Sequence, residues 1–263
     1  MSTDSYLLEN RAPDAGTRFV ALSALFDGVT MRHVDGIGAR AGWRCWEVGA
    51  GGPGVPRLLA ERIGPTGYVL ATDLDVSWMG TDLPGNVEVR RHDVATDAPP
   101  EPGFDLVHAR LVLVHVPQRD EALRRMVAAL RPGGWLLIED FDVNLQPLAC
   151  LEARQEAEQR ANRVRAGFRE LLAQRGVDLA YGRTLPRRLR DAGLTDVAAD
   201  AFEPVALPAA AALEIANVRQ VAPALISQAR ASAEEVDAHL RAVAAGQLDI
   251  ATPPLISARG RHP

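Results

Sequence analysis

The sequence contains no lysine, because all 29 of its basic residues are arginine. A protein without lysine cannot form a lysine Schiff base, anchor pyridoxal phosphate through one, or use a lysine as general base. It also cannot build the phosphate-binding loop whose glycines lead into Lys-Ser or Lys-Thr. Several enzyme classes are therefore excluded before any motif is considered.

Four further absences in the sequence limit the compartment and the partners that we expect for the protein. The two cysteines, Cys45 and Cys150, are too few for a disulfide framework or a zinc cluster, so we expect a reducing cytoplasm and no metal. Residues 1–10 lack the basic and apolar segments of a signal peptide. No apolar run reaches the roughly 18–20 residues of a membrane span. The net charge of -5 gives no case for a nucleic-acid or membrane partner.

The middle of the chain alternates short β-rich runs with helical segments. Strands are predicted over residues 44–48, 68–72, 87–91, 105–109 and 135–140, and helical faces over 55–63 and 123–130. Arg131-Pro132-Gly133-Gly134 reads as a stop and a turn between the second helix and the last strand. Such alternation predicts a parallel sheet with helices on both faces.

The two ends of the chain have a different texture. The first 40 residues are mostly helical in pattern, and a long helical stripe runs over residues 145–174. A helix is predicted over 185–192, a strand over 195–202, alanine-rich helices over 209–245 and a final strand over 254–259. With 263 residues and 47% apolar content, the chain can form one large domain or a domain with an elaborated cap.

A glycine-rich loop follows the first predicted strand, in the run W-E-V-G-A-G-G-P-G-V at residues 46–55. Gly49, Gly51 and Gly54 satisfy the dinucleotide pattern G-x-G-x-x-G, and Asp73 follows at about the ribose-binding distance. Glu47 separates the possible ligands, because an acid at the strand tip repels a pyrophosphate and attracts an ammonium group. S-adenosylmethionine carries an ammonium and a sulfonium and no phosphate.

Several segments in order resemble the class I S-adenosylmethionine-dependent methyltransferases, and most of all their small-molecule, natural-product branch. They are E-V-G-A-G-G-P-G, A-T-D-L-D, R-H-D-V, F-D-L-V-H-A-R, H-V-P and L-R-P-G-G-W-L-L-I-E-D-F, between residues 44 and 142. The resemblance implies an α/β fold, a Rossmann-like, doubly wound, seven-stranded and mostly parallel sheet. Residues 1–263 then form one methyltransferase domain, with an N-terminal helical lid at 1–43, a cofactor-binding core at 44–142, and cap helices and C-terminal strands at 143–263.

The same resemblance assigns cofactor contacts to individual residues. Gly49, Ala50 and Gly51 let the loop backbone pass the methionine part of the cofactor, while Glu47 acts toward its amine through loop amides or water. Asp73 accepts both ribose hydroxyls. The remaining contacts are Leu74 beside the adenine, Asp93 at the adenine amino group, Val94 as an apolar wall, and Ala109 and Arg110 near the methionine end. Pro53 departs from the family pattern but suits the first turn of a helix.

Each of these residues also has a purely structural interpretation. The glycines could form a tight turn with no ligand, Asp73 could cap a helix, and Asp93 could be a turn former. The motifs also indicate binding of the cofactor better than they indicate methyl transfer. An enzyme that binds S-adenosylmethionine and catalyses a non-methyl reaction such as cyclisation therefore stays open, as does a nicotinamide-dependent oxidoreductase.

Two residues are candidates for catalysis if the methyl acceptor is a hydroxyl, whose proton a base must take. His115 follows the fourth predicted strand and Asp140 ends the fifth, so we predict a His115–Asp140 pair at one edge of the sheet. O-, N- and C-methylation all stay open, with S-adenosyl-L-homocysteine as product. A metal-dependent mechanism is disfavoured because the relatives that use it have a lysine near the metal. We expect a small-molecule, partly hydrophobic acceptor and a homodimer as one arrangement of the chain.

Overall fold

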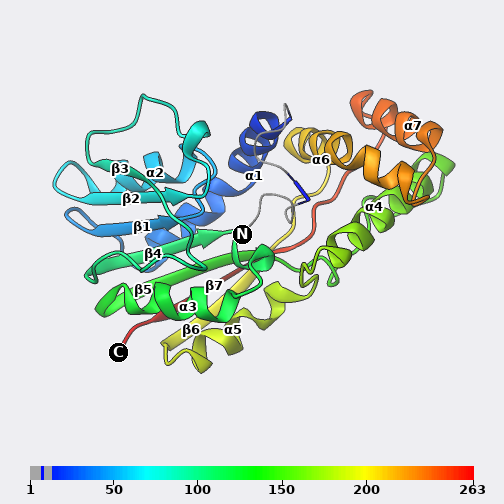
Figure 1. Ribbon diagram of the computed structural model, residues 1–263. Coiled ribbons are helices and arrows are strands. Elements are labelled where there is room, and N and C mark those ends of the chain that lie inside the picture. Colours follow the sequence, from blue (N-terminus) through cyan, green and yellow to red (C-terminus); the bar gives the residue numbers. More distant parts are fainter. Residues whose placement is uncertain (1–6, 9–13) are drawn as a thin grey trace. The chain divides into compact units, whose positions relative to one another are not determined.

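The computed structural model describes residues 7–8 and 14–263, and its chain divides into two compact units. The first unit comprises residues up to Leu25, Asp142–Ala180 and Glu203–Pro254, and the second comprises Phe26–Phe141, Tyr181–Phe202 and Leu255–Pro263. Helix α1 (Ala15–Gly36) contributes to both (Figure 1). The predicted strands and their crossover helices lie in the second unit.

The second unit contains a seven-stranded sheet in the order β3-β2-β1-β4-β5-β7-β6 (Figure 1). Its strands are β1 (Arg44–Val48), β2 (Tyr68–Asp73), β3 (Val87–Arg91), β4 (Phe104–Arg110), β5 (Leu130–Phe141), β6 (Thr195–Phe202) and β7 (Leu255–Arg261). The five strands β1 to β5 pair in parallel, whereas β7 pairs antiparallel with both β5 and β6. The predicted seven-stranded, mostly parallel α/β sheet is confirmed.

Helices cover both faces of this sheet. On one face, α2 (Gly54–Ile63) and the second half of α1 pack on the central strands in a core that includes Val34, Leu59, Ile63, Leu106 and Leu137. Helices α3 (Arg119–Ala128) and α5 (Tyr181–Asp191) cover the other face. Because side chains alternate along a strand, each central strand buries apolar residues on both sides.

The first unit is helical and has its own core. Helices α4 (Glu156–Gln174), α6 (Pro208–Ser227) and α7 (Ala233–Ala244) pack around Phe168, Leu171, Val221 and Leu225. Ser232 begins α7 with a reciprocal capping box to Glu235, which satisfies two otherwise unpaired backbone donors. A buried ion pair joins Arg165 of α4 to Glu214 of α6 at 2.6 Å, and His239 of α7 also contacts Glu214.

Two predicted elements differ from the structure for local reasons. Arg131–Gly134 does not turn but continues β5, where an irregular register against β4 absorbs Gly133 at φ +76°. Residues 145–155 are not helical, because the side chain of Asn162 accepts the backbone amides of Ala149 and Cys150. The predicted alanine-rich helices are confirmed as two helices that are separated at residues 228–232. Part of the predicted N-terminal helical region lies outside the described residues.

No helix among the described residues is long and apolar enough to cross a membrane.

Candidate functional site

The glycine-rich loop joins β1 to α2 and requires glycine at two positions. Gly49 and Gly51 have φ angles of +64° and +63°, which side-chain-bearing residues rarely adopt. A Cβ atom at Gly49 would also overlap the side chain of Val112. Ala50 donates its backbone N–H to the carbonyl of Thr72 at 2.9 Å, so the loop lies against the end of β2. Pro53 precedes the first helical residue, as its fixed φ favours.

Asp73 ends β2 and holds the glycine loop in place. Its carboxylate accepts the backbone N–H of Gly51 at 2.9 Å and that of Asp75 at 2.9 Å. Burial raises the pKa of Asp73, while the amides of Asp75 and Gly51 oppose this shift. Each carboxylate oxygen has a second lone pair, so Asp73 can still accept bonds from a ligand. Leu74, which follows it, is about half exposed at 48%.

The next two predicted positions also lie at the carboxyl ends of neighbouring strands. Asp93 follows β3, and its carboxylate accepts the backbone N–H of Ala95 at 2.9 Å. Val94 and Ala109 are buried, the second at the end of β4. Arg110 ends β4, where its guanidinium donates to the carboxylate of Asp27 at 2.7 Å and to the hydroxyl of Thr30 at 3.0 Å, both on α1. The structure therefore brings all the predicted cofactor residues to one edge of one unit.

Glu47 has a partner that the sequence did not reveal. Its carboxylate lies 2.5 Å from Nδ1 of the buried His108, and Nε2 of the same imidazole lies 3.2 Å from Glu139. Ser257 donates to Glu139 at 2.6 Å, and Thr30 donates to it from α1. The carboxylate of Glu47 is thus directed along the sheet to His108.

These side chains form a polar row across five adjacent strands beneath α1. We define the row as Glu47 on β1, His108 on β4, Glu139 on β5, Ser257 on β7 and Asp200 on β6. Cα register pairs Glu47 with His108, and pairs Ser257 with both Glu139 and Asp200. From the sequence, Glu47 was assigned to the cofactor site, but the contacts that join it to His108 and Glu139 depend on which strands become neighbours.

Electrostatic contacts shift the pKa values of the buried members of this row. Burial alone would lower the pKa of His108, but the carboxylates of Glu47 and Glu139 raise it to about 9. Burial would raise the pKa of Glu139, but its contacts with His108, Arg110 and Ser257 lower it to about 2. Burial raises the pKa of Glu47, against the influence of His108. A charged imidazole bonded to the Glu139 carboxylate is therefore the neutral-pH state.

Asp140 lies on the opposite face of β5, and the predicted His115–Asp140 pair is not formed. The carboxyl group is fully buried, and neither oxygen has a hydrogen-bond partner within the described part of the chain. Burial raises its pKa well above the ordinary value, although the nearby amides of Leu113 and Val114 and the charge of Arg119 oppose this. The carboxyl group lies instead near the backbone amides of Leu113 and Val114 in the 3₁₀ helix η3 (Leu113–His115), and the catalytic roles stay a prediction.

Tyr181, a buried residue near Asp140, was not predicted from the sequence as part of this region. Tyr181 at the start of α5 is fully buried, and its hydroxyl has no hydrogen-bond partner among the residues that the structure describes. Burial and the proximity of Asp140 raise its pKa. Two buried polar side chains near each other thus lack hydrogen-bond partners within the described residues. Within residues 7–8 and 14–263, no group of His, Cys, Asp or Glu is arranged to hold a metal ion.

The residues at the carboxyl edge fit S-adenosylmethionine. The positive φ angles of Gly49 and Gly51 shape the loop after β1, Asp73 has acceptor capacity left for hydroxyl groups, and Val94 is an apolar residue at a neighbouring strand end. A pyrophosphate would meet the carboxylate of Asp73 beside the loop amide that it already occupies. The donor set therefore suits a ligand without phosphate.

Comparisons with known proteins agree with this geometry. A family model described as a methyltransferase domain matches residues 39–199, more than half of the chain. Methyltransferase str2 of Strobilurus tenacellus is 35% identical over 140 residues, which are 53% of this chain and 48% of that protein. Phosphoethanolamine N-methyltransferase 1 of Arabidopsis thaliana is 27% identical over 191 residues, 70% of this chain and 35% of that protein. The matched segment thus spans about half or less of these curated relatives.

Among solved structures, the chain is similar in fold to phosphoethanolamine N-methyltransferase 2 of Haemonchus contortus, in complex with phosphomonomethylethanolamine and S-adenosylhomocysteine. The TM-score is 0.60 at 16% sequence identity, with 98% of this chain and 60% of that chain covered. The family match carries the assignment, and this likeness supports the fold. The chain belongs to the family of methyltransferase domains, the class I S-adenosylmethionine-dependent methyltransferases.

Proposed function

We propose that this chain transfers the methyl group of S-adenosylmethionine to a small-molecule acceptor at oxygen, nitrogen or carbon. The observation that supports it most is the glycine loop bound to the Asp73 carboxylate, with Asp93 and Ala109 at the neighbouring strand ends. Ligands of open α/β sheets bind at the carboxyl ends of the strands. The match to a methyltransferase domain over residues 39–199 supports methyl transfer as the chemistry of the chain.

Named residues of the edge would hold the cofactor. Asp73 would accept hydrogen bonds from the ribose hydroxyls. Asp93 would accept a hydrogen bond from the amino group of the adenine, which would lie between Leu74 and Val94. The loop at Gly49, Ala50 and Gly51 would lie along the methionine part. When bound, S-adenosylmethionine supplies an electrophilic methyl group. The protein then has to hold the acceptor nucleophile aligned with it and exclude water.

His115 is proposed as the base that takes the acceptor proton, since it ends η3 just after β4. For Asp140 we propose a different role from that of a charged partner. Burial raises the pKa of its carboxyl well above the ordinary value, which favours the neutral form over a charged one. We assign Asp140 a positioning role instead, beneath the η3 turn that carries His115.

The acceptor is proposed to be of medium size and partly apolar. Leu145, Leu148 and Leu151 between β5 and α4 are 55%, 38% and 48% exposed, which gives the first unit an apolar surface without an assigned structural purpose. We place the reaction in natural-product biosynthesis in the cytoplasm, and a homodimer is the proposed assembly. The two free, buried cysteines are compatible with a reducing compartment.

The test is incubation with S-adenosylmethionine and a panel of hydroxylated, amine and phenolic metabolites, followed by mass spectrometry. The proposal expects a product heavier by one methyl group and an equal amount of S-adenosyl-L-homocysteine. An acceptor that is converted without S-adenosyl-L-homocysteine would favour a non-methyl reaction. Binding of NAD, with no binding of S-adenosyl-L-homocysteine, would favour the oxidoreductase alternative.

A further inference from the structure

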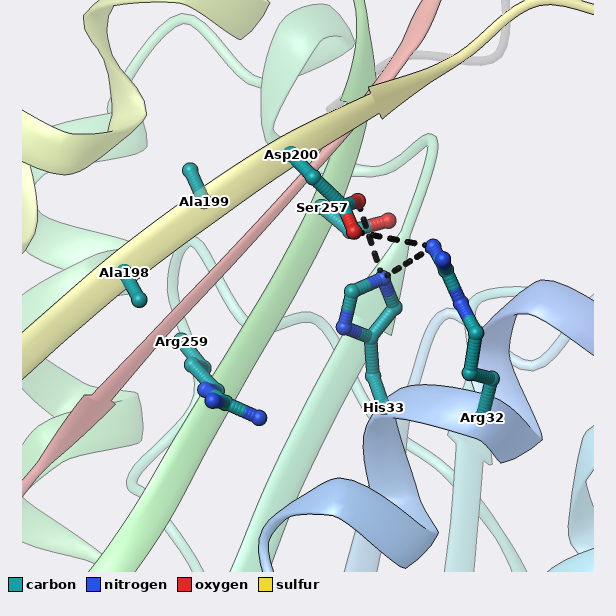
Figure 2. Close-up of a pocket in the computed structure, with 7 residues that line it drawn as sticks. All are labelled: Arg32, His33, Ala198, Ala199, Asp200, Ser257 and Arg259. Carbon is teal, nitrogen blue, oxygen red and sulfur yellow. Dashed lines mark hydrogen bonds and ion pairs between the residues drawn. The ribbon is translucent and has the colours of Figure 1, made fainter.

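A pocket of about 320 Å³ lies on the α1 side of the sheet, within the second unit and apart from the predicted cofactor edge. Figure 2 shows that Arg32 and His33 reach it from α1, while Asp200 from β6 and Ser257 and Arg259 from β7 line the opposite side. This volume lies at the lower end of the range for small-ligand sites. It suits an ion or a small polar molecule.

Positive charge exceeds negative charge among the residues that line this pocket. Asp200 is the one acid, and it is shared by Arg32 at 2.9 Å and by His33 at 3.1 Å. In the described part of the chain, no carboxylate pairs with Arg259, and Figure 2 draws no bond from it to the other pocket residues. Even with His33 neutral, the two arginines leave the pocket with one unbalanced positive charge.

The pocket walls are held in place before any ligand arrives. Ser257 is almost fully buried, and its hydroxyl donates to Glu139 in the polar row. His33 is 8% exposed and is fixed by Asp200. A methyl group at Gly36 would lie 3.0 Å from Nη1 of Arg259, which places the guanidinium against the end of α1. A preorganised site loses less entropy when it binds.

We propose that this pocket binds a small oxyanion of the phosphate class, either free phosphate or a phosphomonoester. Arg259 contributes its unpaired guanidinium, and Arg32 and His33 contribute N–H groups that now bond to Asp200. A guanidinium presents parallel donors that match two oxygens of a phosphate. A dianion gains more from the excess positive charge than a monoanionic carboxylate does. The pocket lining includes none of the residues that we assign to the cofactor.

Titration calorimetry with inorganic phosphate at constant ionic strength tests this proposal on the full chain. Wild type is expected to bind one phosphate, and Arg259→Gln to weaken binding by roughly tenfold or more, the loss of charge-assisted hydrogen bonds. Asp200→Asn removes the competing acid, so it is expected to tighten binding. The charge-matched control is Arg40→Gln, an exposed arginine in the same unit outside the pocket. It is expected to bind phosphate as wild type does.

The outcomes separate cleanly. No phosphate binding by folded wild type would overturn the proposal, as would equal weakening by Arg259→Gln and Arg40→Gln, which indicates diffuse attraction. Weaker binding by Asp200→Asn would also overturn it. Melting curves establish that each variant is folded. Glycerol phosphate identifies the ligand's source, since tighter binding than inorganic phosphate indicates a phosphomonoester and weaker binding indicates the free ion.

Discussion

Two aspartates near the carboxyl ends of strands, Asp73 on β2 and Asp140 on β5, differ in their hydrogen bonding. Asp73 accepts two backbone amides and keeps acceptor capacity, as suits a ligand-binding group. Asp140 is fully buried with no hydrogen-bond partner among the described residues, and burial raises its pKa well above the ordinary value. The two aspartates differ because Asp73 accepts two well-formed backbone hydrogen bonds, whereas the amides of Leu113 and Val114 only partly oppose the effect of burial on Asp140.

Asp73→Ala is expected to weaken S-adenosyl-L-homocysteine binding by at least about tenfold. The change removes the proposed acceptor for the ribose hydroxyls and the bond that holds Gly51, and each bond to a charged group contributes about 1.5–3 kcal/mol. Titration calorimetry measures the loss. The matched control is Asp82→Ala, whose carboxylate is 98% exposed and should leave affinity unchanged. Unchanged affinity in Asp73→Ala would mean that the ribose is held elsewhere.

Asp140→Asn is expected to stabilise the protein at neutral pH. A carboxyl whose folded pKa is raised binds a proton that the unfolded chain releases, so wild type loses stability as pH rises above about 3.9 toward the folded pKa. Asparagine resembles the neutral acid and removes this loss. Thermal melts across pH should show a gain for the variant that shrinks as pH falls toward about 4. A gain of the same size at all pH values would contradict the assignment.

His115→Ala is expected to lower turnover by roughly 10²–10⁴, the usual contribution of a general base, with cofactor affinity near wild type. The wild-type pH–rate profile should have an ascending limb that the variant lacks. Turnover measured across pH checks the loss of rate and the pH dependence, and titration calorimetry with the cofactor alone checks the affinity. Retention of full turnover would show that proximity alone drives the reaction with that acceptor.

The sequence predicts which side chains lie at the strand ends, but it does not predict which partners those side chains contact. The glycines and Asp73 were predictable because their positions follow from strand ends and backbone conformation. His108 was not, because its importance depends on which strands become neighbours. Asp140 was placed correctly on β5, yet its partner depends on how η3 folds over it, which no sequence spacing specifies.

At the scale of elements, the polar row links helix α1 to the sheet. Thr30 of α1 bonds to Glu139, Arg110 of β4 bonds to Asp27, and Asp200 of β6 bonds to His33. Apolar packing by Val34 on the same helix adds to these contacts. The second half of α1 is therefore fixed by directional bonds as well as by hydrophobic burial, which specifies its register on the strands.

His108→Gln is expected to remove a pH dependence of stability that wild type shows. The folded pKa of about 9 exceeds the ordinary histidine pKa of about 6.5, so the stabilisation is complete below about pH 6.5 and is lost as pH rises through about 9. The pH-dependent part amounts to roughly 3 kcal/mol. Urea unfolding at intervals across this window measures it.

The matched control for this variant is His92→Gln, a histidine of the same unit that lies outside the polar row. It should keep the wild-type decline between pH 6.5 and about 9. Titration of the buried Cys45 thiol affects wild type and variants alike, so it cancels in the differences. A wild-type decline that survives in His108→Gln would assign it to another group.

Element prediction was most accurate where a segment's own pattern decides its structure. The residues of β1, β3 and β6 were predicted to the residue, because each is a short run bounded by polar or turn residues. The helix predicted from residue 145 begins only at Glu156, because Asn162 captures the preceding backbone. The side chain that makes this contact is more than two helical turns away, so the local hydrophobic periodicity does not predict it.

At the scale of the whole molecule, every residue assigned to the cofactor lies in the second unit, which also contains the sheet. The first unit contributes α4, α6 and α7 around a separate core and a buried Arg165–Glu214 pair. The predicted boundaries of lid, core and cap along the chain stay a prediction. The contacts show instead that each compact unit is assembled from three separate segments.

This division predicts where cofactor binding will change backbone protection. Hydrogen exchange with saturating S-adenosyl-L-homocysteine should slow in segments 48–52, 73–75, 93–95 and 109–111, because the loop amides and strand ends there would become covered or immobilised. Helix α7 in the first unit serves as the internal control, and its exchange should not change. NAD at the same concentration should protect none of these segments. Protection confined to other parts of the chain would place the cofactor away from this edge, and would contradict the role given to Asp73 and the glycine loop together.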